Sequence, residues 1–226
     1  MKILASDYDN TLYVQNKDVF QKNIELVNEF IKRENKFIII TGRSYQGIKN
    51  DLIENNIPYD YLICNDGAKI FDKYDNVLKT EVLSEEKIYI CQKILKEENI
   101  ESYLEDGLKK INTTNNCIKV VGIFNDKIKA EKIVERIKEE ANVYAYLSTE
   151  HINIIESHVN KYHGLAELLK QENLSSENLF VIGDEINDYE MLSKFKGATM
   201  SEHSEVLDEL NLKEYETLYE CIEELL

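Results

Sequence analysis

The feature that most constrains the fold is a continuous apolar run at residues 37–40, which ends at the polar tripeptide TGR of residues 41–43. A strand with one face in solvent alternates apolar and polar residues, whereas a strand covered on both faces is apolar throughout. Residues 179–182 form a second such run, which ends at the Gly-Asp pair of residues 183–184. Both runs predict central strands of a parallel sheet with helices on its two faces.

Helical periodicity alternates with these runs. Apolar residues at positions 20, 24, 27 and 31 are spaced by four, three and four, which places them on one face of a helix. Short connections between buried strands favour parallel pairing through such helices. The predicted order in the first part of the chain is strand 2–6, helix 18–34, strand 37–40, helix 45–55 capped by Ser44, and a third strand ending near residue 65. The same pattern returns after residue 161. It consists there of helix 163–171, a strand ending at residue 183, helix 187–195, strand 197–200 and helix 218–226.

The middle of the chain has a different pattern. Predicted strands come in pairs, beginning with a hairpin at 68–83, and two amphipathic helices separate them. This pattern is typical of an α+β unit with an antiparallel sheet. We therefore predict an α/β fold, in which a Rossmann-like core of residues 1–66 and 159–226 is interrupted by an inserted α+β domain of residues 67–158. The apolar residues expected to face inward from the helices of the insert are Ile88, Cys91, Leu95, Ile128, Ile133, Val134 and Ile137.

Composition excludes several classes of protein. The net charge of −16 would repel a phosphate backbone, so we expect no nucleic-acid partner. The four cysteines lie in apolar patterns without a Cys-x-x-Cys pair, which indicates buried thiols of a reducing compartment, and the four histidines contain no His-x-x-x-His that would support a zinc site. No run approaches the 18 apolar residues that a transmembrane helix needs. The apolar stretch before residue 7 is too short for a signal peptide. We expect a cytoplasmic protein with no membrane partner, as a monomer or weak homodimer.

Polar residues gather where the predicted parallel strands end. Asp7, Thr41 and Asp184 each lie just beyond the carboxyl end of a strand, which is where open α/β sheets bind their ligands. The carboxylates of Asp7 and Asp184 offer the hard oxygens that suit Mg²⁺. Thr41 and the N–H groups of residues 42–44 stand at a helix start, which favours an anion, and Lys161 could add a positive charge. Together these groups describe a phosphoryl-transfer site.

The spacing of Asp7 and Asp9 suggests a division of labour. Asp7 could attack phosphorus and form an acyl-phosphate, while Asp9 could protonate the leaving oxygen and then activate water. The plain alternative is a strand-end turn with helix-capping carboxylates. Asp184 and Asp188 could likewise be helix caps, and Lys161 a surface lysine. Arg43 could cover the substrate or form a supporting salt bridge, Asn65 and Asp66 could touch the substrate or form a hinge turn, and His158 and His163 are interpreted as structural.

Four short motifs resemble those of the haloacid dehalogenase-like phosphatases. Residues 7–11, DYDNT, match the Asp-x-Asp-x-Thr signature of that family. The TGR of residues 41–43, Lys161 and the GDEIND of residues 183–188 are similar to its other three motifs, in order. The CNDGA of residues 64–68 and the large insert resemble the Cof-type subgroup, which carries an α+β cap. The resemblance covers nearly the whole chain.

The resemblance implies a role for each matching residue. Asp7 would be the nucleophile and Asp9 the acid/base, with its backbone carbonyl on Mg²⁺, and Thr11 would support the loop. Thr41, Gly42, Arg43 and Asn187 would bind phosphate or substrate, and Lys161 would bridge nucleophile and phosphate. Asp184 and Asp188 would complete the Mg²⁺ site with Asp7 and Asp9.

The predicted function is a Mg²⁺-dependent phosphatase that acts on a small phosphorylated metabolite, such as a sugar phosphate, through an aspartyl-phosphate. One alternative is a phosphomutase, which would return the phosphoryl group to the sugar instead of releasing it. Another is a non-catalytic small-molecule-binding protein on the same scaffold, although a retired site has no reason to keep Asp7, Asp9, Lys161 and Asp184.

Overall fold

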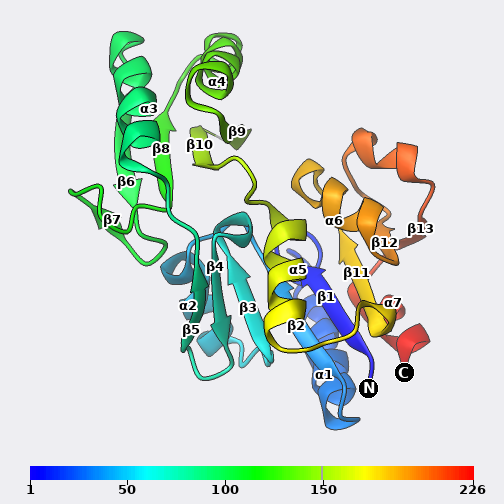
Figure 1. The fold of residues 1–226 in the computed structure, drawn as a ribbon. Coiled ribbons are helices and arrows are strands. Elements are labelled where there is room, and N and C mark those ends of the chain that lie inside the picture. The colour runs from blue at the N-terminus through cyan, green and yellow to red at the C-terminus, as the bar shows by residue number, and fades with distance from the viewer. Residues whose placement is uncertain (149) are drawn as a thin grey trace.

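An eight-stranded sheet forms the larger part of the molecule in the computed structural model, which describes residues 1–148 and 150–226 (Figure 1). Its strands lie in the order β13-β12-β11-β1-β2-β3-β4-β5, and the six from β13 to β3 pair in parallel. The predicted parallel sheet is therefore confirmed. The strands are β1 (Ile3–Asp7), β2 (Lys36–Ile40), β3 (Tyr61–Cys64), β4 (Lys69–Asp72), β5 (Val77–Thr80), β11 (Leu179–Gly183), β12 (Gly197–Met200) and β13 (Lys213–Tyr215).

Helices cover both faces of this sheet, as the unbroken apolar runs require. Alternate residues of each strand point to opposite faces, so that Phe37 and Ile39 belong to one hydrophobic cluster while Ile38 and Ile40 belong to the other. The first cluster includes residues of α1 (Lys17–Lys32), α2 (Tyr45–Glu54) and α7 (Leu218–Leu225), and the second includes residues of α5 (Lys161–Gln171) and α6 (Tyr189–Lys194). Four short 3₁₀ helices complete this part: η1 (Asn65–Gly67), η2 (Ser176–Asn178), η3 (Ile186–Asp188) and η4 (Glu205–Leu210).

Polar side chains fix where the longer helices begin. An N-cap side chain that accepts a backbone N–H satisfies one of the four donors left free at a helix start. Asn16 caps α1, Ser44 caps α2 as predicted, and Asn160 caps α5 by accepting from the N–H of His163 at 2.7 Å. The last of these caps fixes the first turn of α5, where Lys161 lies.

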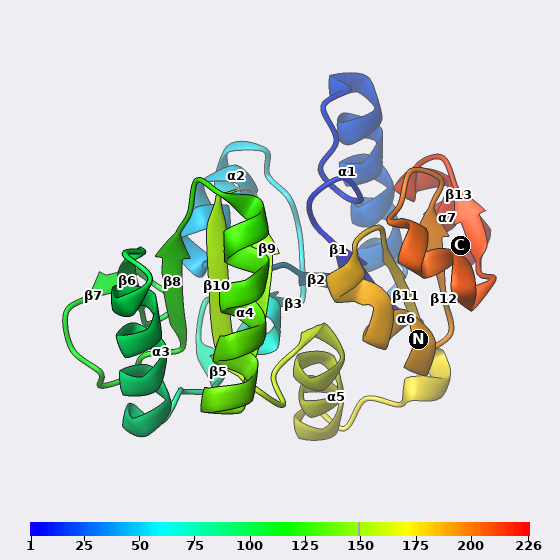
Figure 2. The same ribbon diagram turned by 90° about the horizontal axis from the view of Figure 1, so that it is seen from above.

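The inserted unit has its own antiparallel sheet of five strands in the order β7-β6-β8-β10-β9. Two helices lie on one side of this sheet (Figure 2) and share a hydrophobic cluster with it. The predicted inward residues of these helices are buried except Ile128, whose side chain is 70 % exposed because it lies in the first turn of α4, on the solvent side. The elements are α3 (Glu85–Glu97), β6 (Glu101–Glu105), β7 (Lys110–Ile111), β8 (Lys119–Ile123), α4 (Lys127–Ala141), β9 (Val143–Ser148) and β10 (His151–Glu156).

The hairpin expected at residues 68–83 is present but joins the larger sheet. Its first strand, β4, pairs antiparallel with β3, and β5 pairs antiparallel with β4. By strand pairing, residues 69–80 extend the core sheet, because the tight turn of η1 reverses the chain directly after β3. We therefore propose that the inserted unit begins after Thr80 and ends near Glu156, in place of the boundaries at residues 67 and 158.

Two further expectations concern the chemistry of the chain. All four cysteines are buried, and none forms a disulfide. Within the described residues, no helix combines the length and the apolar character that crossing a lipid bilayer would require.

Two glycines allow close backbone contact between η1 and α5. A Cβ atom built on Gly164 would lie 2.6 Å from the Cα of Gly67, and one on Gly67 would lie 2.3 Å from the carbonyl oxygen of Asn160. Gly67 also has a φ of +106°, which disfavours residues with a side chain. Side chains at either position would therefore push α5 away from the end of β3.

We expect Gly164→Ala to lower the free energy of unfolding by about 1–3 kcal/mol, because the added methyl group overpacks a backbone contact. This loss should outweigh the gain of about 1 kcal/mol in helix propensity. Urea denaturation measures the difference. The matched control is Gly47→Ala in α2, where the nearest atom is Ser44 Oγ at 3.3 Å, so that a small shift of one side chain makes room; this variant should lose less stability than Gly164→Ala. Equal stability of Gly164→Ala and the wild type would contradict the close contact.

Candidate active site

Three neighbouring strands deliver polar residues to one edge of the larger sheet. β11, β1 and β2 lie side by side and run parallel, so their carboxyl ends share an edge. Asp7 ends β1, Thr41 follows β2, and Asp184 follows β11. All three residues are buried. The structure thus brings together residues that lie up to 177 positions apart in the sequence.

A buried lysine joins two of the carboxylates. The Lys161 side chain is 1 % exposed, and its Nζ lies 2.5 Å from Asp7 Oδ1 and 2.8 Å from Asp188 Oδ1. Burial alone would lower the pKa of Lys161, but Asp188 and Asp7 raise it above its ordinary value, so the ammonium stays charged. Burial raises the pKa of Asp7 well above its ordinary value, and the Lys161 ammonium opposes this effect. A further cation beside Asp7 would favour its ionised form.

Backbone donors and Thr11 hold the other carboxylates. Asp188 Oδ2 accepts from the N–H groups of Asp184 at 3.2 Å and Glu185 at 3.1 Å. Asp184 Oδ1 accepts from the hydroxyl of Thr11 at 2.8 Å. Burial raises the pKa of Asp184 to about 6, partly offset by the hydrogen bond from Thr11.

Three of the four predicted metal-ligating residues form one cluster. Oxygen atoms of Asp7, Asp184 and Asp188 lie within 4.8 Å of one another. Crowded carboxylates of this kind repel unless a proton or a cation lies between them, and their hard oxygens suit a small divalent cation. The residues present therefore fit the divalent metal ion that the motifs imply.

The fourth predicted ligand, Asp9, points its carboxylate elsewhere. Arg43 donates to both oxygens of Asp9, with Nε to Oδ2 at 2.9 Å, and its Nη1 donates to Asp51 Oδ2 at 2.8 Å. The Asp9 side chain is therefore outside the carboxylate cluster, so the predicted metal ligation would fall to its backbone carbonyl. Arg43 thus forms salt bridges with Asp9 and Asp51, and its contact with a substrate stays a prediction.

The predicted phosphate loop lies beside the carboxylate of Asp66. The N–H of Arg43 donates to Thr41 Oγ1 at 3.1 Å. A Cβ on Gly42 would lie 3.0 Å from Asp66 Oδ1, so the glycine leaves room for the carboxylate of Asp66. Asn187 Nδ2 donates to that same oxygen at 3.0 Å. The carboxylate of Asp66 therefore joins the loop to Asn187, which is also predicted to bind phosphate or substrate.

Two residues of the insert that the sequence analysis did not single out reach this edge. Lys119 of β8 donates to the carbonyl oxygen of Gly42 at 3.3 Å and lies 3.8 Å from Asp66 Oδ2. Tyr146 of β9 donates from its hydroxyl to Asp66 Oδ2. The signal in the sequence was a lysine within the apolar strand CIKVVGIF and a tyrosine on the alternate face of NVYAYLST.

Buried polar atoms without partners mark the same junction. Both amide atoms of Asn65 and the Oδ1 of Asn187 make no hydrogen bond to the described residues. An unsatisfied buried polar group costs about 1–3 kcal/mol. Because Asn65 follows β3 and Asn187 lies in η3, these atoms stand ready for a polar ligand between the core edge and the insert.

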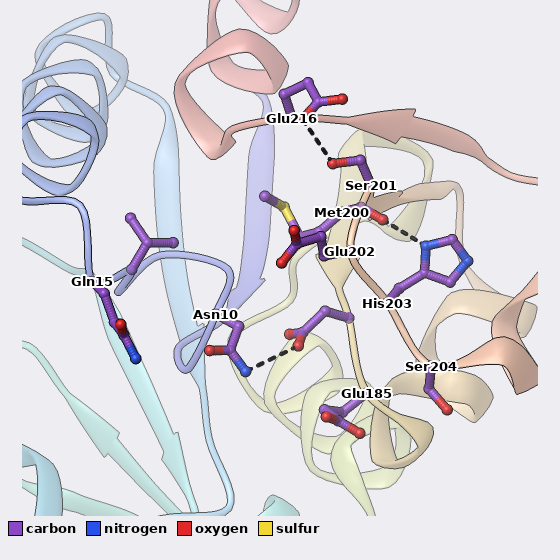
Figure 3. A pocket seen from close by; sticks show the side chains of 11 residues that line it. Asn10, Gln15, Glu185, Met200, Ser201, Glu202, His203, Ser204 and Glu216 are labelled. Atoms are coloured by element: carbon purple, nitrogen blue, oxygen red, sulfur yellow. Dashed lines mark hydrogen bonds between the residues drawn. The ribbon is translucent and has the colours of Figure 1, made fainter.

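A cavity of about 830 Å³ is lined in part by Asp184 (Figure 3). Asn10 reaches into it and donates to Asp184 Oδ2 at 3.4 Å, as the dashed line in Figure 3 marks. Its other walls include Glu185, Glu202, His203 and Glu216. These carboxylates would repel a phosphorylated substrate, so the junction near Gly42 is the better place for one.

Comparison with known proteins agrees with the geometry. The chain belongs to the haloacid dehalogenase-like hydrolases, whose family pattern matches residues 4–109 and 104–213, and among them to the Cof type. It is therefore an enzyme of the hydrolase class.

Relatives and solved structures are similar to nearly the whole chain. An uncharacterised protein of Mycoplasma capricolum is 29 % identical, with 89 % of this chain and 91 % of that protein covered. The 5-amino-6-(5-phospho-D-ribitylamino)uracil phosphatase YcsE of Bacillus subtilis is 23 % identical, with 86 % of this chain and 81 % of that protein covered. The structure of the subclass IIB sugar phosphatase BT4131 has a TM-score of 0.81 at 14 % identity, covering 100 % of this chain and 99 % of the other. These likenesses show a shared fold.

Replacing the buried lysine should expose the repulsion that it offsets. We expect Lys161→Met to lower the free energy of unfolding at pH 7 by about 3–5 kcal/mol, because Asp7 and Asp188 lose a buried counter-charge. The deficit should shrink at pH 5.5. A carboxyl group whose pKa is higher in the folded than in the unfolded state lowers the free energy of unfolding as pH rises from the unfolded pKa to the folded pKa. The fold regains that free energy as pH falls.

Urea denaturation at pH 7 and pH 5.5 measures this deficit. The matched control is Lys170→Met, an exposed lysine of the same helix, which should change stability little at either pH. A Lys161→Met variant with the same deficit at both pH values would contradict the electrostatic explanation.

Proposed function

We propose that the enzyme is a Mg²⁺-dependent phosphatase that hydrolyses a small phosphorylated metabolite of the sugar-phosphate class through an aspartyl-phosphate. The observation that carries the proposal is the buried cluster in which Lys161 joins Asp7 to Asp188 beside Asp184. The phosphatase activities of YcsE and BT4131 support the reaction class, and the sugar or sugar-alcohol phosphate character in their names supports the substrate class.

The nucleophile is Asp7. Lys161 holds one of its carboxylate oxygens by hydrogen bonding, which fixes the direction in which the carboxylate faces the phosphate. A carboxylate oxygen forms a bond to phosphorus while the bond from phosphorus to the leaving oxygen breaks. Thr41, the N–H of Gly42 and Asn187 bind the other phosphate oxygens, and Lys161 offsets their negative charge.

Asp9 is the general acid and then the general base of the reaction. It gives a proton to the leaving oxygen and then takes one from the water that attacks the aspartyl-phosphate, which releases phosphate and restores Asp7. In the structure the carboxylate of Asp9 is bound by Arg43. That ion pair therefore has to open before Asp9 can meet the leaving oxygen.

Asp7, Asp184 and Asp188 would hold Mg²⁺, with the backbone carbonyl of Asp9, and the ion would neutralise charge on the transferring phosphoryl group.

The insert acts as a cap: Lys119 and Tyr146 close over Asp66 and Gly42, which excludes water from the aspartyl-phosphate until the leaving group departs. The buried, unpaired cysteines support a cytoplasmic location.

A panel of phosphorylated metabolites tests the function. Release of free phosphate should require Mg²⁺ and stop on addition of EDTA, and Asp7→Asn should lower kcat by about 10⁴-fold or more, because no other group can form the covalent intermediate. Asp18→Asn, an exposed aspartate in α1, serves as the control and should keep full activity.

The same assay separates the alternatives. Transfer of the phosphoryl group to another hydroxyl without release of phosphate would identify a phosphomutase. Undiminished turnover by Asp7→Asn would rule out the mechanism.

The cap lysine should matter for the leaving group. We expect Lys119→Met to lower kcat/KM for the best metabolite of the panel by about tenfold, equivalent to about 1.4 kcal/mol of transition-state stabilisation. Hydrolysis of p-nitrophenyl phosphate, whose leaving group carries no hydroxyls, should change less. Steady-state kinetics with both substrates measures the difference, and Lys110→Met, an exposed lysine of β7, is the matched control. Equal losses on both substrates would place Lys119 outside leaving-group recognition.

A further inference from the structure

A second cluster of ligand-type side chains lies where the chain crosses between the core and the insert. Glu81 follows β5 in the segment that leaves the core sheet, and His158 lies in the segment that returns after β10. His163 lies in the first turn of α5. We call Glu81, His158 and His163 the hinge cluster. Both crossings and the helix that carries Lys161 each contribute one member.

The spacing of the hinge cluster suits a single ion. One ligand atom of each residue lies within 4.8 Å of the others, and His158 Nε2 is 3.6 Å from Glu81 Oε2. Two ligands that each bind a tetrahedral ion at about 2.0–2.1 Å lie roughly 3.3–3.4 Å apart. The imidazole rings of the two histidines are 4.9 Å apart at 80°, so both can point a nitrogen at a common centre without stacking.

The side chains of the hinge cluster keep atoms available. His163 Nε2 is buried and has no hydrogen-bond partner among the described residues, which is unusual for a buried polar atom. Glu81 Oε1 accepts from Lys79, which leaves Oε2 facing His158. Lys79 is itself bound by Glu167 at 2.8 Å, and Glu156 lies 4.0 Å from His158 Nδ1. Lys87 is in turn bound to Glu156. Three carboxylates around two ammonium groups therefore leave one net negative charge, which favours a cation.

We propose that Glu81, His158 and His163 bind one divalent transition-metal ion of the Zn²⁺ class. Imidazole nitrogens combined with a carboxylate select such ions, whereas Mg²⁺ prefers oxygen ligands alone. The bound ion fastens both crossing segments to the start of α5 and stiffens the joint between core and insert. The site is separate from the carboxylate cluster, and the proposal does not depend on the phosphatase activity.

Co²⁺ is the probe for this site, because nitrogen ligation gives it visible absorption bands. Titration of the full-length protein in excess Mg²⁺ should show one tight Co²⁺ ion per chain, displaced by Zn²⁺. His158→Ala and His163→Ala should each weaken binding by at least about tenfold, the lower end of what even supporting residues of metal sites contribute. His158 is half exposed, so its variant should fold normally.

Two controls make the result decisive. His151→Ala, in β10 away from the hinge cluster, should bind Co²⁺ as the wild type does, and so should Asp184→Asn, which alters only the carboxylate cluster. Zn²⁺ should raise the melting temperature of the wild type and of His151→Ala, but not that of His158→Ala. The proposal is overturned if the wild type binds no more Co²⁺ than His158→Ala does, or if Asp184→Asn abolishes the signal.

Discussion

The site depends on one buried ammonium group. Lys161 lies between Asp7 and Asp188 with almost no access to water, at distances of 2.5 and 2.8 Å. Without it the fold would have to bury crowded carboxylates at the edge of its sheet with no counter-charge, which is costly. The placement of this one side chain depends on the N-cap Asn160 and on the close contact between Gly164 and Gly67. Local helix geometry and the electrostatics of the site are thus coupled.

The core sheet and the convergence at its edge could be predicted from the sequence because both follow from local rules. Unbroken apolar runs indicate strands buried on two faces, and parallel strands end at a common edge. The hairpin of β4 and β5 could not be assigned in the same way, since its pattern fits the edge of either sheet. The position of Ile128 also depended on where α4 begins, which periodicity fixes poorly.

The sequence did not predict the directions of the side chains at the site or their pairing with residues of distant segments. The spacing of Asp7 and Asp9 says nothing about Arg43, which turns the second carboxylate away from the first. Lys119 and Tyr146 meet Asp66 only because the insert folds back over the core. Glu81 lies more than 75 residues before His158 and His163, so no short spacing pattern in the sequence connects it to them.

The paired glycines fix how the turn after β3 lies on α5. With no side chain on Gly67 or Gly164, the backbones of η1 and α5 touch, so a bend at residues 65–67 would drive one backbone into the other. The same contact holds the turn after β3 against the first turn of α5, where Lys161 lies. Asn65 and Asp66 therefore cannot shift without displacing the helix that carries the buried ammonium group.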